Sequence, residues 1–147
     1  MAEKSLAQKL AVRPGNRVAV VNNPAGSDRL LAEITSGASA GGDVETADAV
    51  LLFVGTSGDL ARFWPGASAS VRPDATLWIA YPKRTSAITT DLGRDRGWEP
   101  VVDDGYDAVS QVSLDDTWSA LRFRRDPTLR AQRAARGRPG PGHRPSR

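Results

Sequence analysis

The stretch Ala49-Val50-Leu51-Leu52-Phe53-Val54 decides the fold class of this chain. Six consecutive apolar residues, several of them branched, are typical of a strand that is buried on both faces. Gly55-Thr56-Ser57-Gly58 follows directly and predicts a turn into a helix that carries Leu60, Phe63 and Trp64. A buried strand that leads into a helix is the repeating unit of an α/β sheet.

The alternation of strand and helix extends outward on both sides of this stretch. Toward the N-terminus we expect a helix over 5–10, a strand over 17–21, a helix that begins at Ser27 or Asp28, a loop over 36–42 and a short strand over 43–46. Toward the C-terminus we expect Pro65-Gly66 to bend or interrupt the helix, then a strand over 76–81, a helix over 90–98, and a hairpin of strands 108–114 and 118–123. This order predicts a three-layer α/β/α Rossmann-like open sheet, mostly parallel, with a C-terminal antiparallel hairpin strand.

The composition excludes several kinds of chemistry. The chain has 147 residues, no cysteine and a single histidine, His143, near its C-terminus. Disulfides, thiolate catalysis and cysteine metal sites are therefore excluded, and we expect neither an imidazole base nor a metal site in the folded part. Because no apolar run has the length of a signal segment or a membrane span, we expect a cytoplasmic protein that does not bind membranes.

The formal net charge of +3 combines two unlike parts of the chain. Residues 1–121 contain eleven Lys and Arg against sixteen Asp and Glu, whereas residues 122–147 contain nine arginines and one acid, Asp126. A segment of arginine, proline and glycine has too little apolar surface to offset the entropy of folding. We therefore expect a Rossmann-like α/β domain over 1–125 and a disordered Arg/Pro/Gly-rich tail over 126–147.

The segment 10–26 resembles the opening of the Rossmann-like class I methyltransferases, in which a Gly-x-Gly-x-Gly loop holds S-adenosylmethionine. The three glycines of that loop fall here on Asn22, Pro24 and Gly26, so only the last is kept. Pro24 also removes a backbone N–H that could approach a cofactor. Glu45 falls where the family holds the ribose with an acid. The resemblance implies a degenerate cofactor site with Gly26 and Glu45 as its remaining candidates, and we expect no bound cofactor.

Four segments resemble an uncharacterised, mainly actinobacterial family that is described only as a domain of unknown function. These segments are 6–10, 78–83, 90–95 and 115–123, in the same order along the chain. The resemblance implies a Rossmann-like fold and a cytoplasmic location. It implies no catalytic residues, because the family has no established activity.

The candidate binding site lies where the strands end. Ligands of open parallel sheets bind outside the carboxyl ends of the strands, so we expect the loops 22–26, 55–58 and 81–86 to meet there. The turn Asp115-Asp116-Thr117-Trp118 opens on the same edge if the strand from Ala108 is parallel to its neighbours. Lys83 and Arg84 then face the two aspartates across the crevice.

These residues have two interpretations. In the functional one, Lys83 and Arg84 bind an anion, Asp115 or Asp116 acts as an acid or base, and Trp118 is a stacking wall. In the structural one, the aspartates make the turn, Trp118 packs against a neighbouring strand, and Lys83 forms an ion pair. We assign no catalytic residue, and we interpret the other tryptophans, Trp64, Trp78 and Trp98, as packing residues.

Three functions are consistent with these features. The first is a non-catalytic Rossmann-like module that binds an unknown protein partner or a small ligand at the carboxyl edge. The alternatives are a divergent S-adenosylmethionine-dependent methyltransferase using Glu45 and the Asp115-Asp116 edge, and a nucleic-acid accessory protein whose basic tail binds phosphates weakly and nonspecifically. The dismantled glycine loop beside an intact fold favours the first, so we do not expect an active enzyme.

Overall fold

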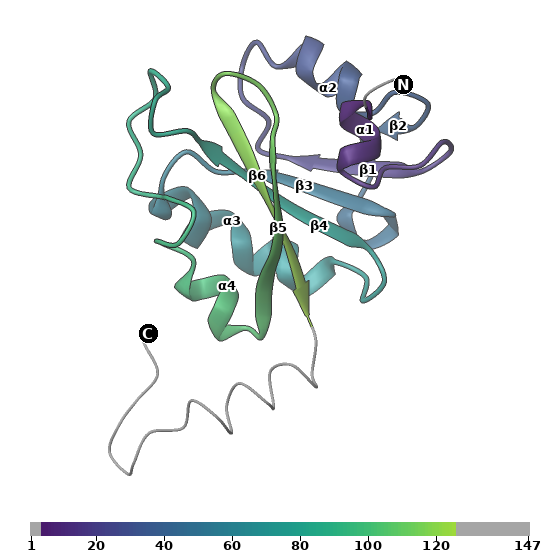
Figure 1. Ribbon diagram of the computed structural model, residues 1–147. Coiled ribbons are helices and arrows are strands. Elements are labelled where there is room, and N and C mark those ends of the chain that lie inside the picture. Colours follow the sequence, from purple (N-terminus) through teal and green to yellow (C-terminus); the bar gives the residue numbers. More distant parts are fainter. Residues whose placement is uncertain (1–3, 126–147) are drawn as a thin grey trace.

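The computed structural model describes residues 4–125, and the predicted tail over 126–147 lies outside them. These residues form a six-stranded sheet in the order β2-β1-β3-β4-β6-β5, with helices on both faces (Figure 1). The strands are β1 (Arg17–Val21), β2 (Ser39–Ala40), β3 (Ala49–Phe53), β4 (Thr76–Pro82), β5 (Tyr106–Ser113) and β6 (Trp118–Arg125). The helices are α1 (Leu6–Lys9), α2 (Asp28–Ile34), α3 (Ser57–Ser70) and α4 (Glu99–Asp103), with a 3-10 turn, η1 (Val44–Thr46).

The sheet is parallel from β2 to β4 and antiparallel in its last part. β1 pairs with β2 and β3, and β3 pairs with β4, all in parallel. β6 lies antiparallel between β4 and β5. The predicted Rossmann-like sheet with a C-terminal hairpin is thus confirmed. Since β5 and β4 both run opposite to β6, the β5–β6 turn lies at the carboxyl ends of the parallel strands.

Apolar side chains fill both spaces between the sheet and its helices. Leu10 of the α1 region and Leu30 and Ile34 of α2 pack on one face of the sheet, and Leu60, Trp64 and Val101 from α3 and α4 pack on the other. All five residues of β3 are buried between the two layers, as the apolar run predicts. This placement makes β3 the centre of the core.

Three tryptophans stabilise these layers. Trp64, Trp78 and Trp98 are 2%, 2% and 6% exposed, which confirms their predicted packing role. Each indole N–H also has an acceptor: Trp78 donates to the Leu10 carbonyl over 2.9 Å, Trp64 to the Asp104 carboxylate and Trp98 to the Gly93 carbonyl. Burial of these large rings therefore leaves no indole donor unsatisfied.

The structure corrects the prediction around the second strand. Residues 43–46 were expected to form a strand, but Val44–Thr46 is the 3-10 turn η1. The strand β2 lies instead at Ser39–Ala40, inside the predicted loop over 36–42, where Arg17 and Val18 pair with it. Two small exposed residues carry no apolar pattern, so only their pairing with β1 defines the strand.

The prediction of a helix over 90–98 is also wrong, and α3 is not interrupted at its proline. Residues 90–98 are not helical: Gly93 and Arg96 form an isolated bridge, and the helix begins later, at Glu99. Pro65 does not interrupt α3, which continues to Ser70. Proline removes one hydrogen bond to the residue four positions earlier, but Ala61 and Pro65 are both exposed, so water can satisfy the freed carbonyl.

The two sides of the sheet end differently. β2 is an edge strand of two residues, and β5 is an edge strand of eight. The pairing of β5 with β6 shifts register between Ala108 and Ser110, so Val109 stands outside the ladder and is 46% exposed. None of the helices within residues 4–125 is long and apolar enough to cross a membrane.

Candidate functional site

The loops predicted to meet at the carboxyl edge do meet there. β1, β3 and β4 run in the same direction, so the segments after Val21, Phe53 and Pro82 lie at one edge of the sheet. The chain places β2 on one side of β1 and β3 on the other, so the strand order reverses beside β1. Such a switch point is where open α/β sheets form their ligand crevice.

The loop after β1 is closed onto β3. Asn22 adopts the left-handed conformation with φ of 58°, and its Nδ2 donates to the Phe53 carbonyl over 2.8 Å. Gly26 also has a positive φ, 78°. The side chain of Ser27 is buried and donates to the Pro24 carbonyl over 2.6 Å. Asn22 therefore keeps the backbone conformation that a glycine would adopt there. Its side-chain amide, however, is already bonded to Phe53 at the switch point.

The loop after β3 has its own partners as well. Gly55 N donates to Asp59 Oδ2 over 2.9 Å, and Asp59 N donates to the hydroxyl of Thr56, the N-cap of α3, over 3.2 Å. Asp91 accepts from Ser57 N over 2.8 Å and from the Ser57 hydroxyl. These two bonds hold the pKa of Asp91 below 3.8, its ordinary value. A carboxylate of the chain itself thus occupies the start of α3.

The β5–β6 turn owes its shape to Asp115. One oxygen of this carboxylate, Oδ1, accepts from Thr117 N over 2.8 Å and from Trp118 N over 2.7 Å. Trp118 is 8% exposed and packs edge-on against Phe53, with ring centres 5.1 Å apart. Asp116 is exposed and, among residues 4–125, makes no hydrogen bond or ion pair. Asp115 and Trp118 therefore shape the turn, whereas the carboxylate of Asp116 is exposed and has no bonding partner among residues 4–125.

Lys83 and Arg84 follow β4 at the same edge of the sheet, beside the β5–β6 turn. The backbone N of Lys83 donates to the Thr117 carbonyl over 2.7 Å, and its Nζ donates to Ser113 Oγ over 2.6 Å. Arg84 is exposed. Neither residue forms an ion pair with Asp115 or Asp116 in the part of the chain that the structure describes. The lysine thus fastens β4 to the hairpin.

A cavity of about 710 Å³ opens between the loop after β1, the start of α2 and the hairpin. It brings together four of the predicted site residues: Gly26, Asp115, Asp116 and Trp118. Glu45, Lys83 and Arg84 do not line it, and Glu45 is exposed on η1. The remaining lining residues are Pro24, Ala25, Ser27, Arg29, Leu30, Glu33, Ala87, Ile88 and Thr117. We call this space the carboxyl-edge cavity.

The sequence gives a partial signal for the residues that were not predicted. Arg29 and Glu33 are four residues apart, so they share one face of α2, and the same helix turns Leu30 and Ile34 toward the core. Ile88 is 39% exposed within a polar loop, and an exposed large apolar side chain beside a cavity is a feature of binding surfaces. What the sequence does not reveal is that α2 and the loop after β4 flank the same hairpin.

The charges of the cavity are mostly negative. Glu33, Asp115 and Asp116 contribute carboxylates, and Arg29 is the one cation among the described residues that line the cavity. Trp118, Leu30 and Ile88 supply an apolar wall. In residues 4–125 no group of three or more His, Cys, Asp or Glu side chains could hold a metal ion. The arrangement suits an organic group that carries positive charge.

The fold resembles that of Rossmann-like S-adenosylmethionine-dependent methyltransferases of known structure. A SAM-dependent methyltransferase from Aquifex aeolicus has a TM-score of 0.51 at 13% sequence identity, over 79% of this chain and 85% of that one. The DhpI–SAH complex has a TM-score of 0.51 at 13% identity, over 84% and 83%. No family model and no curated protein matches the sequence. Membership of the actinobacterial family therefore stays a prediction.

Proposed function

We propose that this chain is a non-catalytic Rossmann-like binding module that holds a positively charged group, from a small ligand or a partner protein, in the carboxyl-edge cavity. The observation that carries the proposal is that the cavity is open, whereas the donor groups of the loops at the switch point are already bonded within the chain. Glu33, Asp115 and Asp116 line an open space beside Trp118, and Asp116 has no bonding partner among the described residues. Asn22, Gly55 and Ser57, by contrast, already have bonding partners within the chain.

The closed switch point argues against methyl transfer. A cofactor that used the donors of the loops after β1 and β3 would have to displace the Phe53 carbonyl from Asn22 and the Asp91 carboxylate from Ser57. Each lost hydrogen bond of this kind costs on the order of 1 kcal/mol, and somewhat more for a charged acceptor. Binding in the carboxyl-edge cavity requires neither displacement.

The second candidate is a divergent S-adenosylmethionine-dependent methyltransferase, and the fold comparisons support it more directly than they support a binding module. The Aquifex aeolicus enzyme is a SAM-dependent methyltransferase and DhpI binds SAH, at the same TM-score of 0.51. A local observation also favours it. Asn22 and Gly26 keep positive φ angles, so the loop follows a path that glycines would otherwise provide.

Native mass spectrometry separates the two candidates. The full chain, purified gently from its own host, is measured as isolated and after addition of S-adenosylmethionine, and co-purifying proteins are identified in parallel. For a binding module, we expect a retained small molecule or a specific co-purifying protein, and no methyl transfer. Transfer of a methyl group by the purified chain would establish the second candidate instead.

Comparison of two variants tests whether the retained molecule or partner protein binds in the carboxyl-edge cavity. Glu33→Gln with Asp116→Asn removes two carboxylates without changing side-chain size, and we expect about tenfold weaker binding for each charge-assisted bond lost. Arg84→Gln is the control because Arg84 is exposed at the same edge and does not line the cavity. Equal binding by both variants, or a bare mass with no co-purifying protein, would contradict the proposal.

A further inference from the structure

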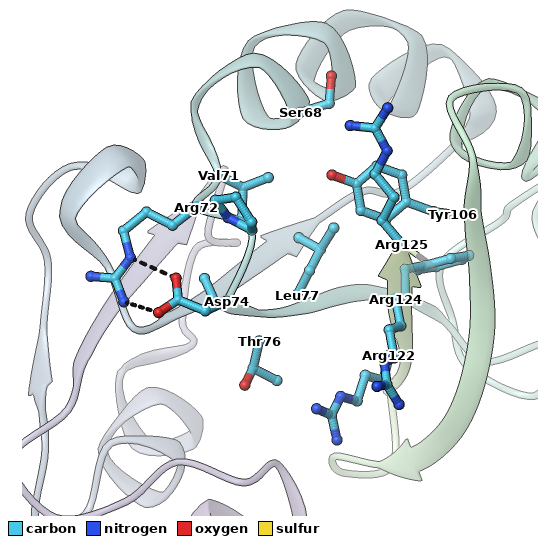
Figure 2. Close-up of a pocket in the computed structure, with 13 residues that line it drawn as sticks. Ser68, Val71, Arg72, Asp74, Thr76, Leu77, Tyr106, Arg122, Arg124 and Arg125 are labelled. Carbon is cyan, nitrogen blue, oxygen red and sulfur yellow. Dashed lines mark hydrogen bonds and ion pairs between the residues drawn. The ribbon is translucent and has the colours of Figure 1, made fainter. Parts of the chain in front are cut away.

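A second cavity, of about 950 Å³, opens at the opposite edge of the sheet, where the parallel strands begin (Figure 2). It lies between the segment that joins α3 to β4 and the last residues of β6. Among the lining residues within 4–125, arginine is the most frequent, at Arg72, Arg122, Arg124 and Arg125, and Asp74 is the single acid. We call it the arginine cavity.

Asp74 does not neutralise this cluster, because it is committed to one arginine. Its two oxygens accept from Nε and a terminal nitrogen of Arg72 over 3.1 and 3.2 Å, as Figure 2 shows. The same guanidinium lies 3.5 Å from Asp48. Bonding to Arg72 holds the pKa of Asp74 below 3.8, so the carboxylate stays charged and paired. Counting only ion pairs between residues 4–125, Arg72 is therefore the one arginine of the cavity with acidic partners.

The sheet holds the backbone of the other three arginines, and successive side chains of β6 point to opposite faces of the sheet. β6 is bonded on both sides, with Phe123 opposite Leu77 of β4 and Arg125 opposite Tyr106 of β5. Within residues 4–125, Arg122, Arg124 and Arg125 form no ion pair. Three cations within four residues of one strand concentrate positive charge at this end of the sheet, and a bound anion would offset that charge.

The aromatic wall of the cavity adds no competing negative charge. The guanidinium of Arg125 lies over the ring of Tyr106, 6.0 Å from its centre, and that ring packs edge-on against Trp64 at 5.2 Å. Burial raises the pKa of the Tyr106 phenol above 10.0. The phenol is thus neutral at physiological pH, and the free charge in this part of the cavity is positive.

These features point to phosphate as the ligand chemistry. A guanidinium presents planar pairs of N–H donors that match the oxygens of a phosphate group. The cavity is larger than one phosphate needs, and the sequence that continues from Arg125 contains six further arginines and one acid, Asp126. A run of cations that continues past the site matches a polymer of phosphates better than a single anion.

We propose that the arginine cavity binds phosphodiester groups of a nucleic-acid strand, independently of its base sequence. Arg122, Arg124 and Arg125 contact the phosphates, and Arg72 with Asp74 forms the fixed wall opposite them. The site is separate from the carboxyl-edge cavity, so it does not depend on the function proposed there.

The test measures binding of a fluorescent single-stranded RNA of about 20 nucleotides to the full chain, by anisotropy, over a series of salt concentrations. Each phosphate contact contributes about 0.7 to the slope of log K against log salt for a single strand. We expect Arg122→Gln with Arg125→Gln to lower that slope by about 1.4 and to weaken binding severalfold near 100 mM salt. The control, Arg62→Gln with Arg94→Gln, changes the net charge equally at exposed positions outside the cavity.

Two results of this experiment would overturn the proposal. Equal slopes for the cavity variant and the control would overturn the proposal, because the binding would then come from net charge alone. Displacement of the RNA by an equal concentration of pyrophosphate would also overturn it, by assigning the cavity to a small phosphorylated ligand. If the glutamine variant fails to fold by circular dichroism, Arg122→Lys with Arg125→Lys keeps charge and side-chain stem. It should retain the slope and lose affinity, since lysine lacks the planar donor pair.

Discussion

Asn22 shows how one residue can preserve a backbone path while changing what the loop can bind. Its φ of 58° lies in the region that glycine adopts freely, and asparagine is among the few other residues that tolerate it. The sequence predicted that losing two glycines damages the loop, and it could not predict that the asparagine side chain would bond to Phe53 of the next strand. That bond depends on β3 lying beside β1.

Substitutions of Asn22 should separate its two roles. Asn22→Gly keeps access to the positive φ and loses only the bond to Phe53, so we expect a fall of about 0.5–1.5 kcal/mol in the free energy of unfolding. Asn22→Ala should cost about 1 kcal/mol more, because alanine resists the left-handed conformation. Urea denaturation of both variants measures the difference, and equal stabilities would show that the backbone conformation at this position carries no cost.

The Asp91–Ser57 contact should make the chain sensitive to acid. Because the pKa of Asp91 is lower in the folded chain than its ordinary value of 3.8, its contribution to stability is complete well above pH 3.8 and is lost as the pH falls through the folded value. Asp91→Asn should therefore be less stable than the wild type at neutral pH. The gap in melting temperature should narrow as the pH is lowered from about 6 to about 3, and a gap that stays constant with pH would contradict this assignment.

Among the elements, those with a strong local pattern were predictable and those defined by distant contacts were not. The continuous apolar runs of β1, β3 and β4 predict these strands, since a strand buried on both faces does not need alternating polar and apolar residues. The helix predicted over 90–98 does not form. Leu92 and Trp98 are both buried, but they lie six positions apart, which does not fit one face of a helix. Their burial comes from packing of the loop under the sheet.

The β5–β6 hairpin depends on Asp115 and not on its neighbour Asp116. Asp115→Ala removes the acceptor of two backbone N–H groups, so we expect a loss of about 1–2 kcal/mol in the free energy of unfolding. Asp116→Ala removes an exposed carboxylate with no bonding partner among the described residues, so its stability should stay within about 0.5 kcal/mol of the wild type. Thermal melts of the two variants test this, and similar losses in both would disprove the division of roles.

At the scale of the whole molecule, the sequence predicted the class of fold and the edge where the loops meet. It did not predict the cavity that lies there, because that space is bounded by α2, a loop and a hairpin that are far apart in the chain. The arginine cavity was also not predicted. Arg122, Arg124 and Arg125 were counted as part of the basic segment 122–147, and the pairing of β6 with β4 brings them opposite Arg72.

Stability should be distributed unevenly across the sheet. Every residue of β3 is buried, and β4 is bonded to β3 and β6, whereas β2 and β5 each have a neighbour on one side. Amide hydrogen exchange should therefore be slowest in β3 and β4 and fastest in β2 and in the bulged part of β5. Slower exchange in β2 than in β3 would contradict the architecture as an account of local stability.

The unequal ends of the sheet bear on how the protein behaves when it is concentrated. An exposed strand is a template on which another chain can add, and long flat edges of this kind seed fibrils. Here one edge offers only Ser39 and Ala40, and the other is broken where Val109 leaves the ladder. Neither presents an unbroken row of backbone donors and acceptors. The fold therefore disfavours edge-to-edge aggregation, because β2 is too short and β5 is too irregular for another strand to pair along it.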